Sequence, residues 1–253
     1  MKVVGIEKLS MVDYPGALAA VLFTPGCNLN CFFCHNRRLI AAADALHTWL
    51  GEEVALAWLD ERKEFLDAVV ISGGEPTLQP GLPDFIRLVR EKGYLVKLDT
   101  NGTNPDRLAQ LLREGILDYV AMDVKAPPHR YEEMCGVQVD LTSIDASIQL
   151  LLNSTIPYEF RSTVVPQLDE HDVVAIAHWV RGARRYVLQQ FRRPQEAGHF
   201  PDLRNAGTPR SADWLQSVLP RIRSLVKTCE TRGFDAPDRA ALAPWPAYAQ
   251  ATG

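Results

Sequence analysis

Short apolar runs alternate with amphipathic stretches along most of the chain, and this alternation constrains the fold more than any other feature. Several runs are almost continuously apolar, which is typical of strands buried on both faces. Six strands are expected, at residues 19–23, 68–72, 94–99, 119–123, 159–164 and 185–189. Strands that alternate with helices predict a parallel sheet with right-handed crossovers.

The stretches between the strands carry helix signals. At 83–92 the apolar residues fall on one stripe and Gly93 follows as a stop, and Asn104 reads as the N-cap of a helix that Gly115 ends. Further helices are expected at 141–152 and 170–180. The predicted fold class is α/β, an incomplete (β/α)6 TIM-like barrel in a single domain at 1–233, followed by a C-terminal tail at 234–253. An open sheet with helices on both faces is the alternative.

Composition excludes several classes of function. The chain has 253 residues, 47% of them hydrophobic, and a net charge of -4, so no basic field indicates a nucleic-acid partner. The first ten residues, MKVVGIEKLS, lack the apolar region of a signal peptide, and no apolar run reaches the ~18 residues of a membrane span. We therefore expect a cytoplasmic protein. Cys135 and Cys229 stand alone in the sequence, and both are expected to be structural.

Three of the five cysteines, Cys27, Cys31 and Cys34, lie in the segment GCNLNCFFCHN at residues 26–36. Without an export signal, metal binding is favoured over disulfides, and thiolates select iron–sulfur clusters or zinc. A closed zinc site needs a fourth ligand. His35 directly follows Cys34, and adjacent residues rarely turn onto the same ion. A four-iron cluster held by three cysteines leaves one iron open, which is what a catalytic metal needs.

Polar residues follow the second expected strand, in ISGGEPTLQP. Gly73 and Gly74 remove side chains where a ligand must approach the backbone, and Glu75 supplies an acceptor for a cationic group. Because ligands bind at the carboxyl ends of strands in both candidate folds, this segment is a candidate site. A plain strand-to-helix loop is the alternative.

The next two strands also end in polar residues, in KLDTNGT and MDVKAP. A charge at the end of a buried strand costs desolvation unless it is paired or coordinated. Two carboxylates and a lysine that converge at one barrel mouth can satisfy one another, a cation or a ligand. The residues concerned are Asp99, Thr100, Asn101, Asp123 and Lys125. The alternative is that Asp99 or Asp123 caps the next helix.

The C-x3-C-x2-C spacing, followed by a β/α run, resembles the radical S-adenosylmethionine (SAM) superfamily. The resemblance implies that Cys27, Cys31 and Cys34 hold a [4Fe-4S] cluster whose open iron chelates the amino and carboxylate groups of SAM. Reduction of the cluster would then release a 5′-deoxyadenosyl radical. The family's GGE motif, which holds the methionyl amine of SAM, corresponds to Gly73, Gly74 and Glu75 in this sequence. The family also carries an aromatic residue near the adenine, and Phe33 stands at that position. Loop packing is the alternative for Phe33.

Further segments resemble those of glycyl-radical-enzyme activases. Their DTNG and D-x-K segments lie beside SAM, which implies a carboxylate contact for Lys125 and a monovalent cation held with the help of Asp99, Thr100 and Asp123. Asn101 belongs to the same DTNG segment. Arg161, in FRSTVVP, is similar to an arginine in the corresponding activase segment, and a surface salt bridge is its alternative.

Among activases, the chain most resembles the activating proteins of anaerobic ribonucleoside-triphosphate reductase. Activases carry a similar D-x-P-G segment, here at 13–16, and the Cys34-His35-Asn36 ending is also typical of them. The resemblance implies an enzyme that abstracts hydrogen from a glycine of a partner to make a glycyl radical. Flavodoxin or ferredoxin would be the electron donor. Only two cysteines remain outside the loop, so one cluster is expected.

Two other functions stay open. The first is a radical SAM enzyme that acts on a small molecule, such as the 7-deazaguanine-forming synthase, although that family tends to carry another pair after the third cysteine. The second is a non-catalytic iron–sulfur or zinc protein used for electron transfer or scaffolding. This second function leaves GGEP, DTNG and D-x-K at successive strand ends unexplained.

Overall fold

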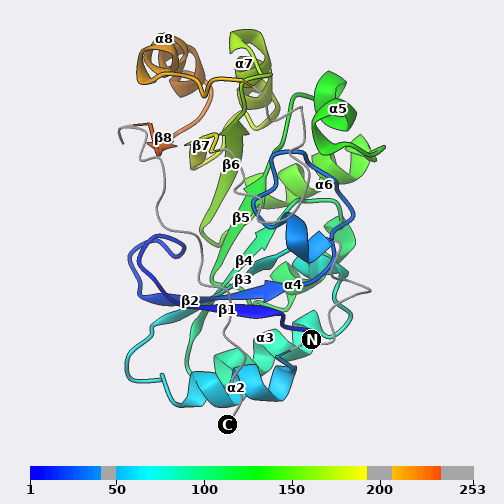
Figure 1. The fold of residues 1–253 in the computed structure, drawn as a ribbon, viewed down its shortest axis with the longest axis vertical. Helices are drawn as coiled ribbons and strands as arrows, with labels where there is room; N and C mark the ends of the chain where they lie inside the picture. Colours follow the sequence, from blue (N-terminus) through cyan, green and yellow to red (C-terminus); the bar gives the residue numbers. More distant parts are fainter. Residues whose placement is uncertain (41–49, 193–206, 235–253) are drawn as a thin grey trace.

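The structure is a computed structural model that describes residues 1–40, 50–192 and 207–234. At its centre is an eight-stranded sheet in which neighbouring strands follow chain order (Figure 1). The strands are β1 (Gly5–Ser10), β2 (Ala19–Thr24), β3 (Ala68–Gly73), β4 (Leu95–Thr100), β5 (Tyr119–Asp123), β6 (Tyr158–Val164), β7 (Tyr186–Gln190) and β8 (Cys229–Arg232). β1 runs antiparallel to β2, and every later neighbouring pair is parallel.

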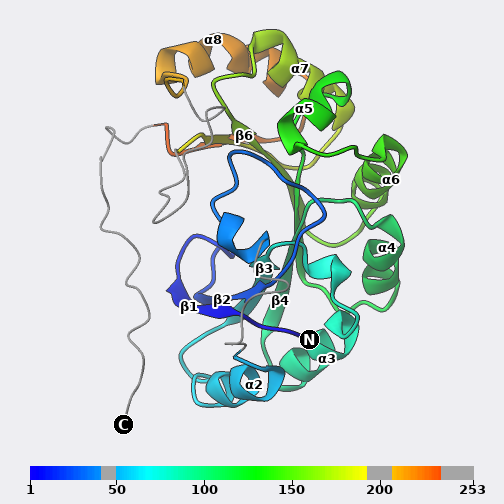
Figure 2. The same ribbon diagram turned by 45° about the vertical axis from the view of Figure 1, so that its right-hand side comes forward.

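The long helices follow one another along the outer, convex side of the curved sheet (Figure 2). They are α2 (Glu52–Asp60), α3 (Leu82–Glu91), α4 (Pro105–Arg113), α5 (Tyr131–Cys135), α6 (Leu141–Leu152), α7 (Glu170–Trp179) and α8 (Ala212–Arg223), with 3-10 turns η1 (Pro76–Leu78) and η2 (Pro128–Arg130). A curved parallel sheet with its helices outside is a partial barrel. The predicted incomplete barrel is therefore confirmed over the described residues, and the two-faced open sheet is not formed there.

The six predicted strands and the predicted helices are present within about one residue of their expected bounds. The Asn104 side chain caps α4 by accepting from the backbone N–H of Arg107. The sequence prediction missed β1, β8, α2, α5 and α8. β1 (GIEKLS) and β8 (CETR) are edge strands rich in charged residues, so they carry no apolar run that would reveal them.

The central strands are buried on both faces, as expected, but the two faces of the sheet differ in polarity. In β2 and β3 both faces are apolar, and a small inner cluster around Val21 and Val70 packs on the concave side. In β4, by contrast, Lys97 and Asp99 alternate with Val96 and Leu98. Because successive residues of a strand point to opposite faces, the concave side becomes polar from β4 onward. This half of the sheet carries the charged residues of the site.

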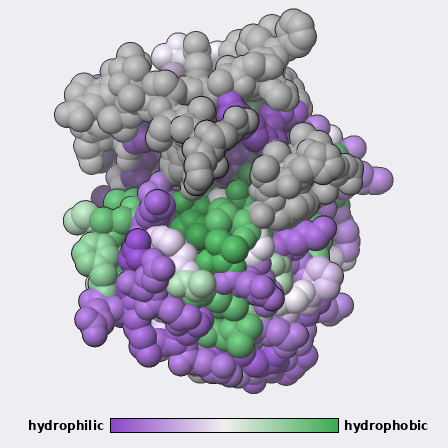
Figure 3. All heavy atoms as spheres, turned by 60° about the horizontal axis from the view of Figure 1, so that its bottom comes forward, coloured by the Kyte–Doolittle hydropathy of each residue, from purple (hydrophilic) through white to green (hydrophobic). Residues whose placement is uncertain are grey.

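The D-x-P-G segment lies in the loop that joins β1 to β2, at the amino end of the parallel strands. The cysteine segment follows the carboxyl end of β2, so the two lie at opposite ends of that strand. Met11 and Val12, in the same loop, are 74% and 78% exposed. From the lower side the molecule shows an apolar area with hydrophilic residues beside and below it (Figure 3).

The predicted C-terminal tail lies almost wholly outside the described residues. Phe234, the first residue of that tail, is buried at 7% exposure and belongs to the main core cluster. The rest of the tail, at 235–253, lies outside the described residues, and the tail remains a prediction. No helix among the described residues is long and apolar enough to span a membrane.

Candidate functional site

Both ends of the cysteine segment are hydrogen bonded to the segment that follows β3. At the first end, the backbone N–H of Glu75 donates to the carbonyl of Gly26 at 2.8 Å. At the other end, Asn36 Nδ2 donates to the carbonyl of Gly73 at 3.2 Å. The GGE and Cys-His-Asn motifs, which are separate in the sequence, therefore form one structural unit at the carboxyl ends of β2 and β3.

The two glycines of GGEP are required by the chain's own backbone. A Cβ atom on Gly74 would lie 1.9 Å from the carbonyl oxygen of Gly26. At Gly73, where φ is +121°, a Cβ would lie 2.3 Å from the backbone nitrogen of Thr24. The physical reason expected from the sequence, space for a ligand, is therefore incomplete. The space beside Gly74 is filled by Gly26 at the start of the cysteine segment, and the space beside Gly73 is filled by the end of β2.

The Glu75 carboxylate is fully buried and is used inside the protein. Its Oε1 accepts from the backbone N–H of Thr77 at 3.1 Å and from the hydroxyls of Thr77 and Thr100 at 2.6 and 2.8 Å, and its Oε2 accepts from the backbone N–H of Asn101 at 2.7 Å. Burial, the largest cause, raises the pKa of Glu75, and the hydrogen bonds to its charged form act against that shift. Glu75 therefore links the GGEP segment to the DTNG segment.

The three thiols lie close to polar groups and to another cysteine. Burial raises the pKa of Cys27 to about 11 and also raises that of Cys34. Cys31 is hydrogen bonded to the thiol of Cys135, the last residue of α5, and this contact is the largest cause that lowers the pKa of Cys31. Cys135, expected to be an isolated structural residue, is fully buried and in contact with the cysteine segment.

The described ranges contain no group of three or more His, Cys, Asp or Glu side chains that converges on a single ion. A mononuclear zinc site at Cys27, Cys31 and Cys34 is therefore not prearranged in those ranges. A multi-iron cluster makes a different demand, since its ligands bind separate irons at the corners of the cluster.

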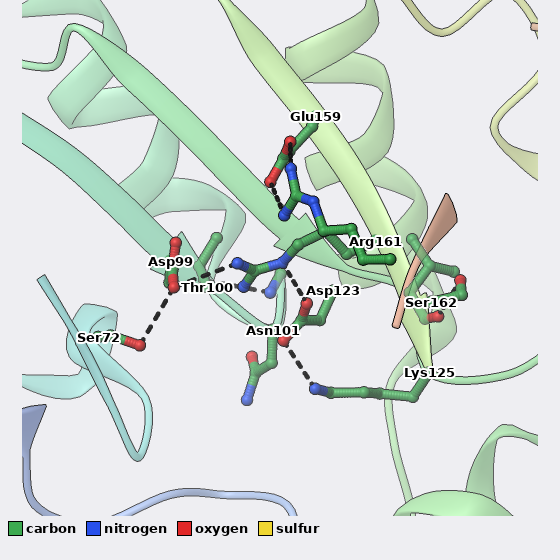
Figure 4. Close-up of polar contacts among 12 residues, drawn as sticks. Ser72, Asp99, Thr100, Asn101, Asp123, Lys125, Glu159, Arg161 and Ser162 are labelled. Carbon is green, nitrogen blue, oxygen red and sulfur yellow. Dashed lines mark hydrogen bonds and ion pairs between the residues drawn. The ribbon is translucent and has the colours of Figure 1, made fainter. Parts of the chain in front are cut away.

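Charged side chains from three strands meet at the concave face beside the cysteine segment (Figure 4). Arg161 Nε donates to Asp123 Oδ1 at 2.8 Å, and its Nη1 donates to Asp99 Oδ2 at 3.3 Å. Lys125 Nζ donates to Asp123 Oδ2 at 2.9 Å. Lys97 Nζ lies 3.1 Å from Asp99 Oδ1. We call these five residues the strand-end network.

This arrangement decides the alternatives raised by the sequence. The N-cap of α4 is Asn104 and that of η2 is Pro127, so neither Asp99 nor Asp123 caps the helical turn that follows it. Arg161 is only 11% exposed, so its ion pairs are not surface salt bridges. Burial opposes ionisation of Asp123, but Arg161 and Lys125 outweigh it and hold the pKa of that carboxyl well below its usual range.

The strand-end network carries more positive than negative charge. Three cationic side chains face two carboxylates, which leaves one excess positive charge. Lys97 Nζ faces Asp99 Oδ1 at 3.1 Å and also donates to the backbone carbonyl of Asp13. A buried site with net positive charge is complementary to an anionic group such as a carboxylate.

Phe33 is 4% exposed, and its ring packs edge-to-face on Phe32 with 5.1 Å between the centroids. This contact fits the loop-packing alternative, and an adenine contact stays a prediction. Lys97 was missed by the sequence analysis. A lysine within an otherwise apolar strand, two positions before Asp99 and therefore on the same face, is the signal that could have found it.

Comparison with known sequences gives one family and several relatives. The sequence profile of the Radical SAM superfamily matches residues 21–180. A protein of Methanocaldococcus jannaschii, provisionally named a glycyl-radical enzyme activating enzyme, is 38% identical over 199 residues, which are 76% of this chain and 80% of that protein. The pyruvate formate-lyase-activating enzyme of Clostridium pasteurianum is 34% identical over 47% of this chain and 50% of its own length. The 7-carboxy-7-deazaguanine synthase of Methanopyrus kandleri is 35% identical over 41% of this chain and 48% of its own length.

Solved structures share the fold at low sequence identity. A domain of the pyruvate-formate lyase-activating enzyme from Bacteroides vulgatus has a TM-score of 0.51 and 18% identity, and the match covers 66% of this chain and 99% of that domain. Streptococcus suis SuiB bound to S-adenosylmethionine has a TM-score of 0.62 and 13% identity, with 84% of this chain and 52% of SuiB covered. At these identities the likeness concerns the fold alone.

Proposed function

The chain belongs to the radical SAM superfamily, and on that premise we propose that it is an activating enzyme for a glycyl radical enzyme. The observation that carries the proposal is the 38% identity to the M. jannaschii protein of that name, which extends over 76% of this chain. Membership of the family implies a [4Fe-4S] cluster and SAM. The proposal adds that the chain holds a single cluster.

The residues at the strand ends fit both groups. Cys27, Cys31 and Cys34 are the soft ligands that an iron–sulfur cluster requires. The excess positive charge of the strand-end network suits the carboxylate of SAM, and Lys125, at 20% exposure, is the most accessible of its three cations. The three cysteines would therefore hold the cluster, and Lys125 would hold the SAM carboxylate with support from Arg161.

Held by Cys27, Cys31 and Cys34, the cluster would supply one electron for the reductive cleavage of SAM to methionine and a 5′-deoxyadenosyl radical. That radical would take a hydrogen atom from a glycine Cα of the partner and so become 5′-deoxyadenosine. The chain's own residues bind, orient and exclude water. Glu75 contributes indirectly, because its carboxylate fixes Thr100 and Asn101 against the cysteine segment.

The remaining predicted contacts are part of this proposal. Phe33 lines the adenine side of the site, and the backbone at Gly73 and Gly74 bounds the methionyl side. A monovalent cation held with the help of Asp99, Thr100 and Asp123 stays a prediction. In the structure Asp99 contacts Lys97 and Arg161, and Asp123 contacts Lys125 and Arg161.

The proposed partner is anaerobic ribonucleoside-triphosphate reductase, with flavodoxin or ferredoxin as electron donor. The support for this choice is the resemblance of the chain to the activating proteins of that reductase, whereas the D-x-P-G and Cys-His-Asn segments are typical of activases in general. The second candidate is a small-molecule radical SAM enzyme. This candidate is supported by the 35% identity to the 7-carboxy-7-deazaguanine synthase. That match covers 41% of this chain, whereas the match to the activating-enzyme relative covers 76%.

Replacing Lys125 by Met is expected to weaken SAM binding to the cluster-loaded protein by about 10- to 100-fold. The change keeps most of the side-chain volume and removes the excess positive charge. Loss of one charged hydrogen bond costs about 1.5–3 kcal/mol, which corresponds to that range. Equilibrium dialysis with labelled SAM measures the affinity, and iron analysis checks that the cluster is retained.

Lys92→Met is the matched control for this test. Lys92 pairs with the exposed carboxylate of Asp60 beyond the end of α3, so its loss removes an ion pair without touching the site. The control should bind SAM like the wild type. Equal affinity in Lys125→Met and wild type would remove Lys125 from the SAM site.

The partner is tested by electron paramagnetic resonance (EPR) of a candidate glycyl radical enzyme. The chain, loaded with iron and sulfide without oxygen, is reduced and mixed with SAM and anaerobic ribonucleoside-triphosphate reductase. The proposal predicts a glycyl radical doublet and 5′-deoxyadenosine in equal amounts. A doublet with a different glycyl radical enzyme would change the partner, and 5′-deoxyadenosine without a doublet on any of them would favour the small-molecule candidate.

A further inference from the structure

The side chain of Asn101 is enclosed between the DTNG segment and the cysteine segment. It is 5% exposed, and its backbone N–H is held by Glu75 Oε2 at 2.7 Å. Its Nδ2 donates to Asn28 Oδ1 at 3.0 Å and to Cys27 Sγ at 3.7 Å. The distance to sulfur is suited to a hydrogen bond because sulfur is larger than oxygen. Asn101 therefore touches a sulfur atom that the family uses to hold iron.

The hydrogen-bond pattern fixes which end of the Asn101 amide faces the sulfur. Its Oδ1 accepts from the backbone N–H of Thr103 at 3.0 Å and from the hydroxyl of Thr103 at 2.6 Å. A backbone N–H is only a donor, so the atom opposite it must be the amide oxygen. The N–H2 group is then the end directed at Cys27. Asn28 completes the ring, because its own Nδ2 donates to the Thr103 hydroxyl at 2.8 Å.

Cys27 receives a second donor from its own loop, since the backbone N–H of Leu29 lies 3.4 Å from the Sγ atom. Of these two donors, the side chain of Asn101 is the one that a substitution can remove. Hydrogen bonds to the sulfurs are among the factors that set the reduction potential of an iron–sulfur cluster. A donor stabilises the reduced cluster more than the oxidised one, because reduction places additional negative charge on the sulfurs.

We propose that Asn101 is a positioning residue that makes the cluster easier to reduce, by donating its side-chain N–H to the sulfur of Cys27. Glu75 supports this hydrogen bond, because it fixes the backbone of Asn101 and therefore the direction of the Asn101 side chain. The inference rests on the proposed cluster at the three cysteines, but it does not depend on which partner or substrate is used. In this proposal the buried side-chain amide of Asn101 contacts a cluster ligand and not SAM.

The test compares reduction potentials of cluster-loaded proteins by EPR-monitored redox titration without SAM and without partner. Asn101→Ala removes the donor, and Asn101→Asp replaces it with a carboxylate of nearly the same shape. The matched control is Asn104→Ala, because Asn104 lies outside the cysteine segment and its side chain donates to the carbonyl of Thr77 and not to a sulfur. Iron and sulfide analysis of each protein establishes how much cluster it holds.

The proposal predicts a potential more negative than wild type in Asn101→Ala, a larger shift in the same direction in Asn101→Asp, and no shift in Asn104→Ala. A wild-type potential in a fully loaded Asn101→Ala would overturn it. Loss of the cluster from both Asn101 variants while Asn104→Ala keeps it would also overturn it, because Asn101 would then be needed for the structure of the loop. Failure of the proposed function would be seen separately, in wild-type protein that holds the cluster and forms no glycyl radical.

Discussion

Cys34→Ala should lose the four-iron cluster, and its rate of SAM-dependent 5′-deoxyadenosine formation should fall at least ~100-fold below that of the wild type. Changes next to metal ligands already cost 10- to 100-fold in affinity or activity, and the loss of a ligand costs more. Cys34 is the best of the three cysteines to test, because Cys31 has a second thiol, Cys135, beside it. Iron analysis and chromatography of 5′-deoxyadenosine measure the two effects.

Cys229→Ala serves as the control for this experiment. Cys229 begins β8 and lies outside both the cysteine segment and the strand-end network, so its removal should leave iron content and 5′-deoxyadenosine formation close to wild type. If Cys34→Ala retained a full cluster spectrum and full cleavage, the assignment of the three thiols as ligands would be wrong.

Gly74→Ala should destabilise the protein by about 3 kcal/mol or more and sharply reduce cluster loading. The added Cβ would lie 1.9 Å from the carbonyl oxygen and 2.6 Å from the carbonyl carbon of Gly26. Both are backbone atoms, so no side-chain rotation can relieve the clash. The cysteine segment would have to move away from β3, which would break the 2.8 Å hydrogen bond from Glu75 N to Gly26 O. Urea denaturation of the metal-free protein measures the change in unfolding free energy.

Gly5→Ala is the comparison, because a Cβ at Gly5 would meet only Phe23 Cδ2 at 3.7 Å, an ordinary contact. It should change the unfolding free energy by less than about 1 kcal/mol. Equal stability of the Gly74 and Gly5 variants would mean that the cysteine segment does not pack against Gly74 in solution.

The sequence predicted those elements that carry a strong local pattern. The buried strands β2 to β7 are nearly continuous or regularly spaced in apolar residues, and Asn104 and Gly115 mark the ends of α4. The charged ends of β4 and β5 were also predicted to converge, because parallel strands bring their carboxyl ends to one edge. The contacts of Arg161 with Asp99 and Asp123 confirm that convergence.

The remaining features depend on contacts between distant residues, which one sequence does not contain. Glu75 was expected to face a ligand, whereas its carboxylate is used by Thr77, Thr100 and Asn101. Cys135 looks isolated in the sequence, and only the placement of α5 brings its thiol to Cys31, more than a hundred positions earlier. In both cases the partner is chosen by tertiary packing and not by local spacing.

We propose that the three thiols and the strand-end network together hold a four-iron cluster and SAM. The direct test is anaerobic loading with iron and sulfide, followed by reduction in the presence of SAM and quantification of iron and 5′-deoxyadenosine per chain. About four irons per chain are expected, and 5′-deoxyadenosine should appear only with reductant and SAM together. A fully loaded four-iron protein that binds SAM and forms no 5′-deoxyadenosine on reduction would contradict it.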